Sequence, residues 1–453
     1  MEKQLFTDFD PISSKQWKQQ IQYDLKGADY NETLVYETLE GIKIKPFYHY
    51  DEAAEPFYTS QKKEAFKICQ NIFVFDIQKS VNRSLETLNR GAESIRFTIE
   101  DKTINPAELL NSLPLESTVI YFNLRFLDVK FVQQLNEIAQ KRTAHFYVHI
   151  DPIGHLAREG NWFYDLKSDF ELLNEIKRTC MHLTILSVDG TLYQNAGANM
   201  VQQIAYLAAH ATEYFNRVHH LSGTVLLQVA VGSHYFFEIA KLRALRMVLE
   251  TIAAEFNPEL KVHVLSIPSK RNKTLYDYNV NMLRTTTECM SAILGESDAI
   301  MNLPYDALYH KENEFGDRIA RNQLLILKHE SYFDKTHNPA DGAYYIESIT
   351  TQLAEKALAL FKEIETTGGF INQLTEGTIQ RKIQESAAKE QELFDSGKEI
   401  LVGTNKFPNK EDRMSQDLEL FPFVKQKPRK TIIIPIIEKR LAEKLEQERL
   451  ASE

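Results

Sequence analysis

The sequence predicts an α/β protein built on a (β/α)8 (TIM) barrel, with an N-terminal arm and a helical C-terminal extension. About eight short runs rich in β-branched and aromatic residues alternate with helical patterns between residues 73 and 303, which favours a parallel sheet. Eight such units over some 230 residues fit a barrel by length. The Gly-rich first turn that is typical of doubly wound sheets is missing.

The predicted strands are short and are taken in chain order. Two of them are largely apolar at residues 225–227 and 262–265, as expected for strands that helices cover on both faces. The eight runs are residues 73–77, 94–99, 118–124, 145–150, 183–188, 224–231, 261–267 and 298–303.

Three regions are expected: an arm over residues 1–65, the barrel over 66–400 and the extension over 401–453. The arm carries Trp17 and Ile21 on a short amphipathic helix that begins near Ser13, followed by a strand pair between residues 34 and 50. It is too small to bury a core of its own, so we expect it to pack on the barrel or on another chain. From residue 438, Lys, Arg, Glu, Leu and Ala predominate, which predicts an exposed helix with ion pairs.

Composition excludes several classes of function. The formal net charge of -10 disfavours nucleic acid and anionic membranes as partners. No apolar run approaches the ~20 residues of a membrane-spanning helix, and the start of the chain lacks a signal-peptide pattern. The three cysteines are far apart in sequence, with no zinc spacing. A cytoplasmic, reducing location is expected.

Several ordered segments resemble one family, the adenosylcobalamin-dependent acyl-CoA mutases, and methylmalonyl-CoA mutase above all. The resemblance covers residues 5–410, and the order and spacing of the segments make it specific. The family's barrel implies the same fold as the strand pattern. The segments are residues 232–243 (GSHYFFEIAKLR), 281–286 (NMLRTT), 317–323 (DRIARNQ), 338–347 (NPADGAYYIE), 364–370 (IETTGGF) and 401–407 (LVGTNKF).

The resemblance is lost in the segment that carries the catalytic acid of the family. Active mutases have Gly-Tyr-His-Met-Gln-Glu-Ala-Gly-Ala after the fifth strand, whereas residues 190–198 read GTLYQNAGA. The Tyr-His pair therefore falls on Thr191 and Leu192, and leucine can neither donate a hydrogen bond nor move a proton. The family's radical-directing Tyr falls on Asn71. Its coenzyme A contacts fall on residues 224–226 and 265–269, which are largely apolar. We expect no catalytic residues.

The resemblance then implies a non-catalytic structural subunit of a heterodimeric methylmalonyl-CoA mutase, which interconverts methylmalonyl-CoA and succinyl-CoA. The large catalytic subunit would be the partner, and a homodimer is expected when this chain is purified alone. No cofactor is expected on this chain: none of the 13 histidines lies in the family's Asp-x-His-x-x-Gly motif, so adenosylcobalamin would sit in the partner. No flavodoxin-like cobalamin domain is expected within the chain.

Two enzymatic alternatives remain open. The chain could be an active substrate subunit that uses a separate cobalamin-binding chain. It could also be a barrel enzyme of another kind, because Asp151 and His155 follow the fourth predicted strand and could form an acid/base pair. A polar turn is the commoner meaning of such a pattern. His145 and His149 share one face of that strand, but no metal partner is apparent. An open, polar barrel mouth would favour an enzyme, and a filled one a scaffold.

Overall fold

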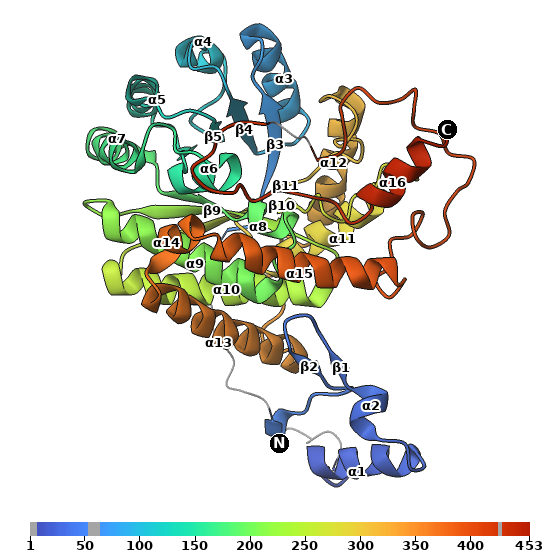
Figure 1. Ribbon diagram of the computed structural model, residues 1–453. Coiled ribbons are helices and arrows are strands. Elements are labelled where there is room, and N and C mark those ends of the chain that lie inside the picture. Colours follow the sequence, from blue (N-terminus) through green and yellow to red (C-terminus); the bar gives the residue numbers. More distant parts are fainter. Residues whose placement is uncertain (1–6, 53–63, 425–427) are drawn as a thin grey trace.

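The computed structural model describes residues 7–52, 64–424 and 428–453. Within these residues, the central sheet has nine parallel strands in the order β7-β6-β5-β4-β3-β11-β10-β9-β8. Figure 1 shows this sheet at the centre of the molecule, with helices around it. A separate two-stranded hairpin belongs to the N-terminal arm. The central strands are β3 (Lys67–Phe73), β4 (Ser94–Ile99), β5 (Val119–Leu124), β6 (Phe146–His149), β7 (Leu183–Thr184), β8 (Ser187–Asp189), β9 (Thr224–Val231), β10 (Lys261–Pro268) and β11 (Ala299–Met301).

The sheet returns on itself through one interrupted strand. Its two ends, β7 and β8, are separated in the sequence only by Ile185 and Leu186. The Leu186 carbonyl accepts a hydrogen bond from the backbone N–H of Leu226 on β9 (2.8 Å), and β11 pairs with β3. The described strands therefore fill eight positions, and the predicted barrel fold is confirmed. The single strand predicted over residues 183–188 is in fact broken in the middle.

The predicted first strand was misplaced. Residues 73–77 follow β3 instead of forming it, and Asp76 caps the next helix by accepting from the backbone N–H of Lys79 (2.8 Å). The true strand, Lys67–Phe73, is less apolar in sequence because Gln70 and Asn71 lie in it. Both line a cavity inside the barrel. Two consecutive polar residues interrupt the apolar run by which a buried strand is usually recognised.

Helices surround the barrel, and a further layer covers one side of it. The outer layer is formed by α13 (Tyr344–Thr366), which packs across α9 and α10, with α14 (Gly369–Thr375) and α15 (Thr378–Asp395) beside it (Figure 1). The helices that follow the strands are α3 (Ile77–Asn89), α4 (Pro106–Leu110), α5 (Val129–Arg142), α6 (Pro152–Glu159), α7 (Leu166–Thr179), α8 (Thr191–Asn195), α9 (Met200–Arg217), α10 (Tyr235–Phe256), α11 (Val280–Leu294) and α12 (Glu314–Leu325), which continues as a π-helical segment, Ile326–Glu330.

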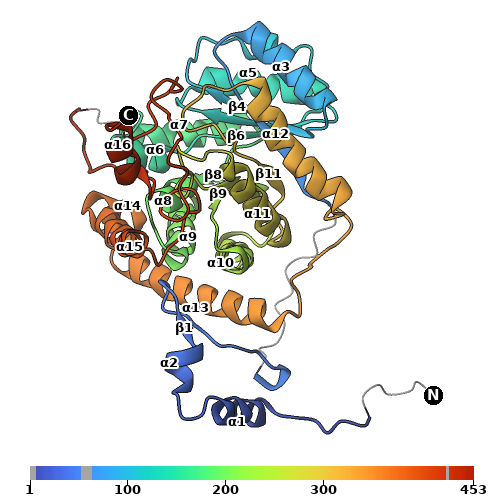
Figure 2. The same ribbon diagram turned by 90° about the vertical axis from the view of Figure 1, so that its right-hand side faces the viewer.

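The arm projects from the barrel below α13, as the two perpendicular views show (Figures 1 and 2). Its first helix, α1 (Ser14–Asp24), begins where the sequence predicts, because Ser13 and Gln16 form a capping box. After α2 (Tyr30–Leu34), the predicted strand pair is only β1 (Tyr36–Glu37) with β2 (Lys43–Ile44). A 3-10 turn, Tyr50–Glu52, follows. The arm touches the barrel unit through this hairpin and through Tyr48, whose ring lies 5.2 Å from that of Tyr345 on α13.

The C-terminal extension is mostly irregular and follows the rim of the barrel. The helix predicted from residue 438 is shorter: α16 spans Glu443–Leu450. It is also less exposed than predicted, because Glu443 and Glu446 are buried. Upstream of α16, the backbone N–H groups of Ile436 and Lys439 donate to the carbonyls of Ala157 and Asn195, in the loops and helices after the fourth and fifth barrel strands.

Candidate functional site

The carboxyl ends of the barrel strands surround a cavity of about 1100 Å³. Barrels of this kind place their functional groups at this end. The mouth is therefore hollow and lined by polar as well as apolar groups. The polar lining includes Gln70, Asn71, Arg96, Thr98, Asn123, Arg125, Arg158, Asp189, Thr191, Lys270 and Glu438; the apolar lining includes Phe73, Ala230, Ile267, Pro268 and Met301.

Aromatic side chains close the barrel beneath this cavity. The rings of Tyr121 and Tyr147 stack with their centroids 5.0 Å apart. Both hydroxyls meet His263: Tyr121 Oη lies 2.8 Å from Nε2 and Tyr147 Oη lies 3.2 Å from Nδ1. Leu226 and Leu265 belong to the same buried cluster. The lower half of the lumen is thus packed, and only the upper half is hollow.

One wall of the cavity carries a compact ion-pair network. Arg158 on α6 contacts Asp189 at the end of β8 (2.9 Å) and Glu438 of the extension (3.2 Å). Burial alone would raise the pKa of Asp189, but Arg158, His149 and a hydrogen bond from Thr191 lower it well below its ordinary value. The extension therefore supplies a carboxylate to the barrel mouth itself.

Thr191 and Leu192 face opposite environments. Thr191 lines the cavity, and its backbone N–H and hydroxyl both donate to Asp189 (3.0 and 2.5 Å). Leu192 is only 1% exposed and packs in the main hydrophobic core. The next residue, Tyr193, is also buried, and its hydroxyl lies 2.8 Å from His210 Nδ1 on α9. Among these three residues, only a threonine hydroxyl that is already hydrogen-bonded reaches the cavity.

Asn71 lies on the cavity wall at β3 and is held by three neighbours. Its amide donates to Glu312 Oε1 (2.7 Å), and its oxygen accepts from Thr98 Oγ1 (3.0 Å) and from Arg96 Nη1 (3.3 Å). Glu312 is held in turn by Arg83 (2.9 Å). Asn71 thus organises polar groups of the lining and offers no group that titrates near neutral pH.

Asp151 and His155 do not form an acid/base pair. Their recorded hydrogen bond joins backbone atoms: the His155 N–H donates to the Asp151 carbonyl (2.8 Å). The imidazole of His155 stacks instead on the ring of Phe163, with centroids 3.9 Å apart. The enzymatic alternative based on this pair therefore loses its geometric support.

Asp151 is a buried structural anchor. Its carboxylate caps α6 at Gly154 N (2.8 Å) and accepts from His210 Nε2 (2.9 Å) and from the Tyr214 hydroxyl (2.5 Å). Burial alone would raise the pKa of Asp151, but His210, with smaller contributions from His149 and Tyr214, lowers it to about 2. A carboxylate with so many donors stabilises the fold and is a weak base at neutral pH.

Comparison with known proteins gives the family. The model of the family described as "Methylmalonyl-CoA mutase" matches residues 114–447. This chain belongs to the methylmalonyl-CoA mutase family. Members with related sequences include the "Methylmalonyl-CoA mutase small subunit" of Porphyromonas gingivalis, which is 31% identical over 90% of this chain and 71% of the relative. The small subunit of Streptomyces virginiae is 32% identical over 57% of this chain and 43% of the relative.

The match to a mutase whose name specifies no subunit is shorter. The "Methylmalonyl-CoA mutase" of Cereibacter sphaeroides is 36% identical over 49% of this chain but only 33% of its own length. The chain therefore spans about a third of that mutase and most of the P. gingivalis small subunit. The P. gingivalis small subunit thus matches a larger share of this chain, 90%, than the C. sphaeroides mutase does, 49%.

Sequence reasoning missed the charged residues that this family member places in the barrel mouth. Arg96 and Arg125 alternate with apolar residues on β4 and just after β5, so a period-2 reading could have placed both in the lumen. Arg158 and Glu438 meet only in the folded chain, because 280 residues separate them. No local pattern signals that contact.

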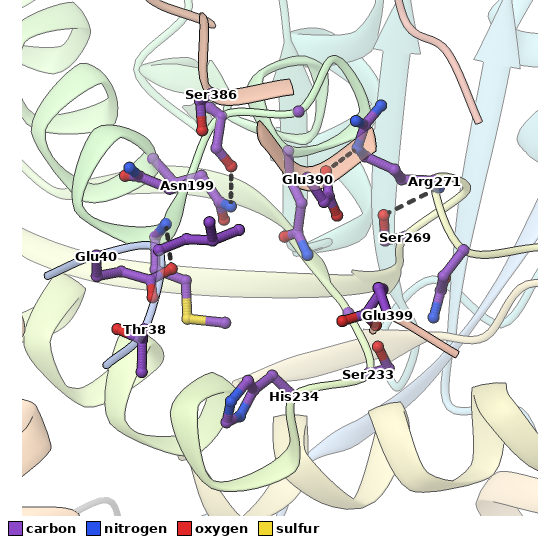
Figure 3. Close-up of a pocket in the computed structure, with 18 of the residues that line it drawn as sticks. Thr38, Glu40, Asn199, Ser233, His234, Ser269, Arg271, Ser386, Glu390 and Glu399 are labelled. Atoms are coloured by element: carbon purple, nitrogen blue, oxygen red, sulfur yellow. Dashed lines mark hydrogen bonds and ion pairs between the residues drawn. The ribbon is translucent and has the colours of Figure 1, made fainter. Parts of the chain in front are cut away.

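A second, smaller cavity lies between the arm and the barrel (Figure 3). It measures about 150 Å³ and lies among the β1–β2 hairpin, the start of α9 and α15. Glu40 accepts from Met200 N (3.3 Å), and Arg271 donates to Glu390 (2.5 Å). Burial, with the nearby Glu390, raises the pKa of Glu399. Its main charged groups hold the hairpin and the loops together.

Neither a metal centre nor a membrane span emerges from the described part of the chain. Residues 7–52, 64–424 and 428–453 contain no cluster of three His, Cys, Asp or Glu side chains placed to hold a metal ion. His145 stacks on Tyr147 at the barrel floor, with ring centroids 4.8 Å apart. In the same ranges, no helix is both long and apolar enough to cross a membrane.

Proposed function

We propose that this chain is the non-catalytic, structural subunit of a heterodimeric methylmalonyl-CoA mutase, and that a large catalytic subunit interconverts methylmalonyl-CoA and succinyl-CoA. The observation that carries the proposal is which residues occupy the family's Tyr-His position and where their side chains lie. Thr191 is bound to Asp189, and Leu192 is buried in the core. No side chain with the acidity of a tyrosine or histidine reaches the cavity from there. The small-subunit names of the two relatives support the same role.

Adenosylcobalamin is proposed to bind the partner subunit rather than this chain. Two observations support this. The motif Asp-x-His-x-x-Gly is absent from the sequence. The extension also runs across the loops that a planar macrocycle would have to face: Lys439 N donates to Asn195 O (3.1 Å) and Leu441 N to Arg271 O (2.9 Å). An extension in this position would obstruct the approach of so large a cofactor, which supports its placement on the partner subunit.

The contribution of this chain would be an interface. The arm carries large exposed apolar groups, among them Trp17 and Tyr23, and monomers seldom expose such groups in clusters. We propose that the arm packs on the large subunit, or on a second copy when the chain is purified alone. A cytoplasmic location fits the three cysteines, which are buried free thiols.

The proposal is tested by measuring the conversion of methylmalonyl-CoA to succinyl-CoA. The purified chain with adenosylcobalamin and methylmalonyl-CoA should form no succinyl-CoA, and addition of the large subunit should restore turnover. The double variant Thr191→Tyr/Leu192→His should stay inactive alone, because residues of one site act as a unit and the other contacts are missing. Turnover by the wild-type chain alone would overturn the proposal. Activity in the double variant would show that the cavity still positions substrate.

A second candidate has one observation in its favour. The barrel mouth keeps a hollow, partly polar cavity of about 1100 Å³, as an active substrate subunit would. In that case a separate cobalamin-binding chain would complete the enzyme. Mixing this chain with an isolated cobalamin-binding chain, without the large subunit, separates the two proposals. Turnover in that mixture favours the active substrate subunit; its absence, together with turnover after the large subunit is added, favours the structural subunit.

A further inference from the structure

The C-terminal extension lies against the loop that follows β11, and Tyr309 of that loop anchors it. The Tyr309 carbonyl accepts hydrogen bonds from the backbone N–H groups of Glu419 and Leu420, both at 2.8 Å. The Tyr309 ring is buried in a cluster that also contains Met414 and Phe423 of the extension. These contacts hold this part of the extension on the rim of the barrel.

His310, the next residue of the loop, stands between two carboxylates, one from each side of this contact. Its Nδ1 lies 3.2 Å from Asp306 Oδ2 in the same loop, and its Nε2 lies 3.5 Å from Asp417 Oδ1 in the extension. A neutral imidazole carries one N–H group, whereas an imidazolium carries two. The ring can therefore donate to both carboxylates at once only when it is protonated.

The two carboxylates differ in how firmly they are held. Asp306 is only 2% exposed, and its carboxylate also accepts from the side-chain amide of Asn313 (2.7 Å). Gly316, in the first turn of α12, makes room for it, because a Cβ at that position would lie 2.5 Å from Asp306 Oδ1. Asp417 is exposed. The imidazole thus joins a buried carboxylate of the barrel to an exposed carboxylate of the extension.

The surroundings of the ring favour its protonated form. Burial alone would lower the pKa of His310, but the hydrogen bond with Asp306 and the charge of Asp417 outweigh it and raise that pKa above its ordinary value. Burial also raises the pKa of Tyr305 and of Tyr309, so both phenols are neutral wherever the histidine titrates.

Further charged groups lie on the elements that meet at this point, and several are engaged by other partners. Glu312 and Asp317 pair with Arg83, and Glu419 accepts from the backbone N–H of Lys311 (2.8 Å). The titratable and charged groups on these elements, besides the three of the bridge, are Tyr278, Tyr305, Tyr309, Lys311, Glu312, Glu314, Asp317, Arg318 and Glu419.

The contact also borders the main cavity. Ala307 and His310 of the loop and Leu420 of the extension all line the 1100 Å³ cavity. The Leu420 N–H is one of the two groups that the Tyr309 carbonyl holds. Release of the extension at this point would therefore change the edge of the cavity mouth.

We propose that His310, with Asp306 and Asp417, forms a proton-dependent latch, the rim latch, that fastens the extension to the barrel. The protonated ring donates to both carboxylates and keeps residues 415–420 on the rim. The neutral ring can donate to only one of them, so the segment opens more often. The inference goes beyond the structural role proposed above and does not depend on it, because it concerns contacts within this chain alone.

The direction of the pH dependence follows from the raised pKa of His310. A contact that favours the protonated ring is fully present below the pKa of a free histidine, about 6.5. It is lost as the pH rises through the higher pKa of the latched state. Mild alkali should therefore release this segment of the extension.

The experiment follows hydrogen exchange in the full-length chain by mass spectrometry of peptides that contain Glu419 and Leu420. The exchange rate at each pH is divided by the intrinsic rate of the unfolded sequence at that pH, which gives a protection factor. The test variant is His310→Gln, whose side chain cannot become charged. The matched control is His219→Gln, because His219 is an exposed histidine in the loop after α9.

In the wild type and in the control, protection at these two amides should fall about threefold between about pH 5.5 and about pH 8.5, the size of effect that a partly exposed ion pair has. In His310→Gln, protection should be low at both pH values and should not fall further. Equal protection of the wild type at the two pH values would overturn the proposal. A fall in His310→Gln as large as that in the wild type would overturn it too.

A variant on the other side of the bridge keeps the test decisive if His310→Gln does not fold. Asp417→Ala removes the acceptor from the extension at an exposed position, where a substitution disturbs little packing. At about pH 5.5 its protection at the same amides should already match the wild-type value of about pH 8.5. Protection equal to that of the wild type at both pH values would contradict the rim latch.

Discussion

The N-terminal arm and the C-terminal extension both lie outside the barrel, yet they relate to it in opposite ways. The arm is rich in aromatic residues and leaves them in solvent: Phe9, Trp17 and Tyr23 are 75%, 48% and 80% exposed. The extension is rich in charged residues and buries several of them: Arg440 and Glu446 are 4% and 0% exposed. Residue type alone would have assigned the two burial patterns the other way round.

The difference lies in the partners that each segment finds within its own chain. Arg440 pairs with Glu446 (2.6 Å) and donates to the carbonyls of Lys273 and Pro422 (3.1 and 3.0 Å). Glu446 also accepts from Leu275 N (2.7 Å). These contacts make the extension an integral part of this chain's fold. In the arm, Trp17 meets Phe47 edge-on and still remains about half exposed, which agrees with the interface proposed for this segment.

The largest expected effect comes from breaking the buried pair of the extension. Glu446→Ala leaves the Arg440 guanidinium buried without its counter-ion, which should lower the free energy of unfolding by about 3–5 kcal/mol. The control in the arm is Glu52→Ala, whose exposed pair with Lys45 (2.9 Å) should contribute less than about 1 kcal/mol. Urea denaturation of both variants gives the two values. Similar losses would mean that the two segments are attached alike.

Deleting the arm should affect association rather than stability. A chain that lacks residues 1–50 should bind the large subunit at least a hundredfold more weakly, a loss of about 2.7 kcal/mol. Its melting temperature should change by no more than about 2–4 °C, the shift that 1 kcal/mol causes in a large domain. Calorimetry with the large subunit measures the affinity, and Trp17→Ala should reproduce part of the loss. Unchanged affinity in the truncated chain would show that the interface lies elsewhere.

Acid should loosen the extension before it disturbs the arm. Burial opposes ionisation of Glu438, but Arg158 and Lys270 outweigh it, so its pKa in the folded chain is lowered. A lowered carboxyl pKa stabilises the fold above the unfolded value of about 4.3, and this contribution is lost as the pH falls below it. Hydrogen exchange at the amides of Ile436 and Lys439 should therefore accelerate below about pH 4.

The matched variant for this prediction is Glu438→Gln, which cannot form the ion pair with Arg158 at any pH. Its exchange at the same two amides should already be faster at pH 7 and should depend less on acid. The hairpin amide of Thr38, which donates to the Ile42 carbonyl (3.0 Å), serves as the arm's reference. A steeper acid response in the variant than in the wild type would contradict the assignment to Glu438.

The sequence by itself determined the barrel, because the period-2 and apolar patterns of its strands depend on local alternation and burial. It also determined that Leu192 cannot serve as an acid, since the chemistry of a side chain needs no tertiary contact. The first strand was misplaced, because Gln70 and Asn71 interrupt its apolar run, and Asn71 faces a polar lumen that no local pattern reveals.

Only the tertiary structure decided which charged groups meet. Asp151 is held by His210 and Tyr214, 59 and 63 residues away, so the acid/base pair that the sequence left open with its neighbour His155 does not form. Glu438 reaches Arg158, although 280 residues separate them in the sequence. An ion pair requires two groups within a few ångströms. For groups hundreds of residues apart, that distance is set by how the barrel closes and by the path of the extension around its rim.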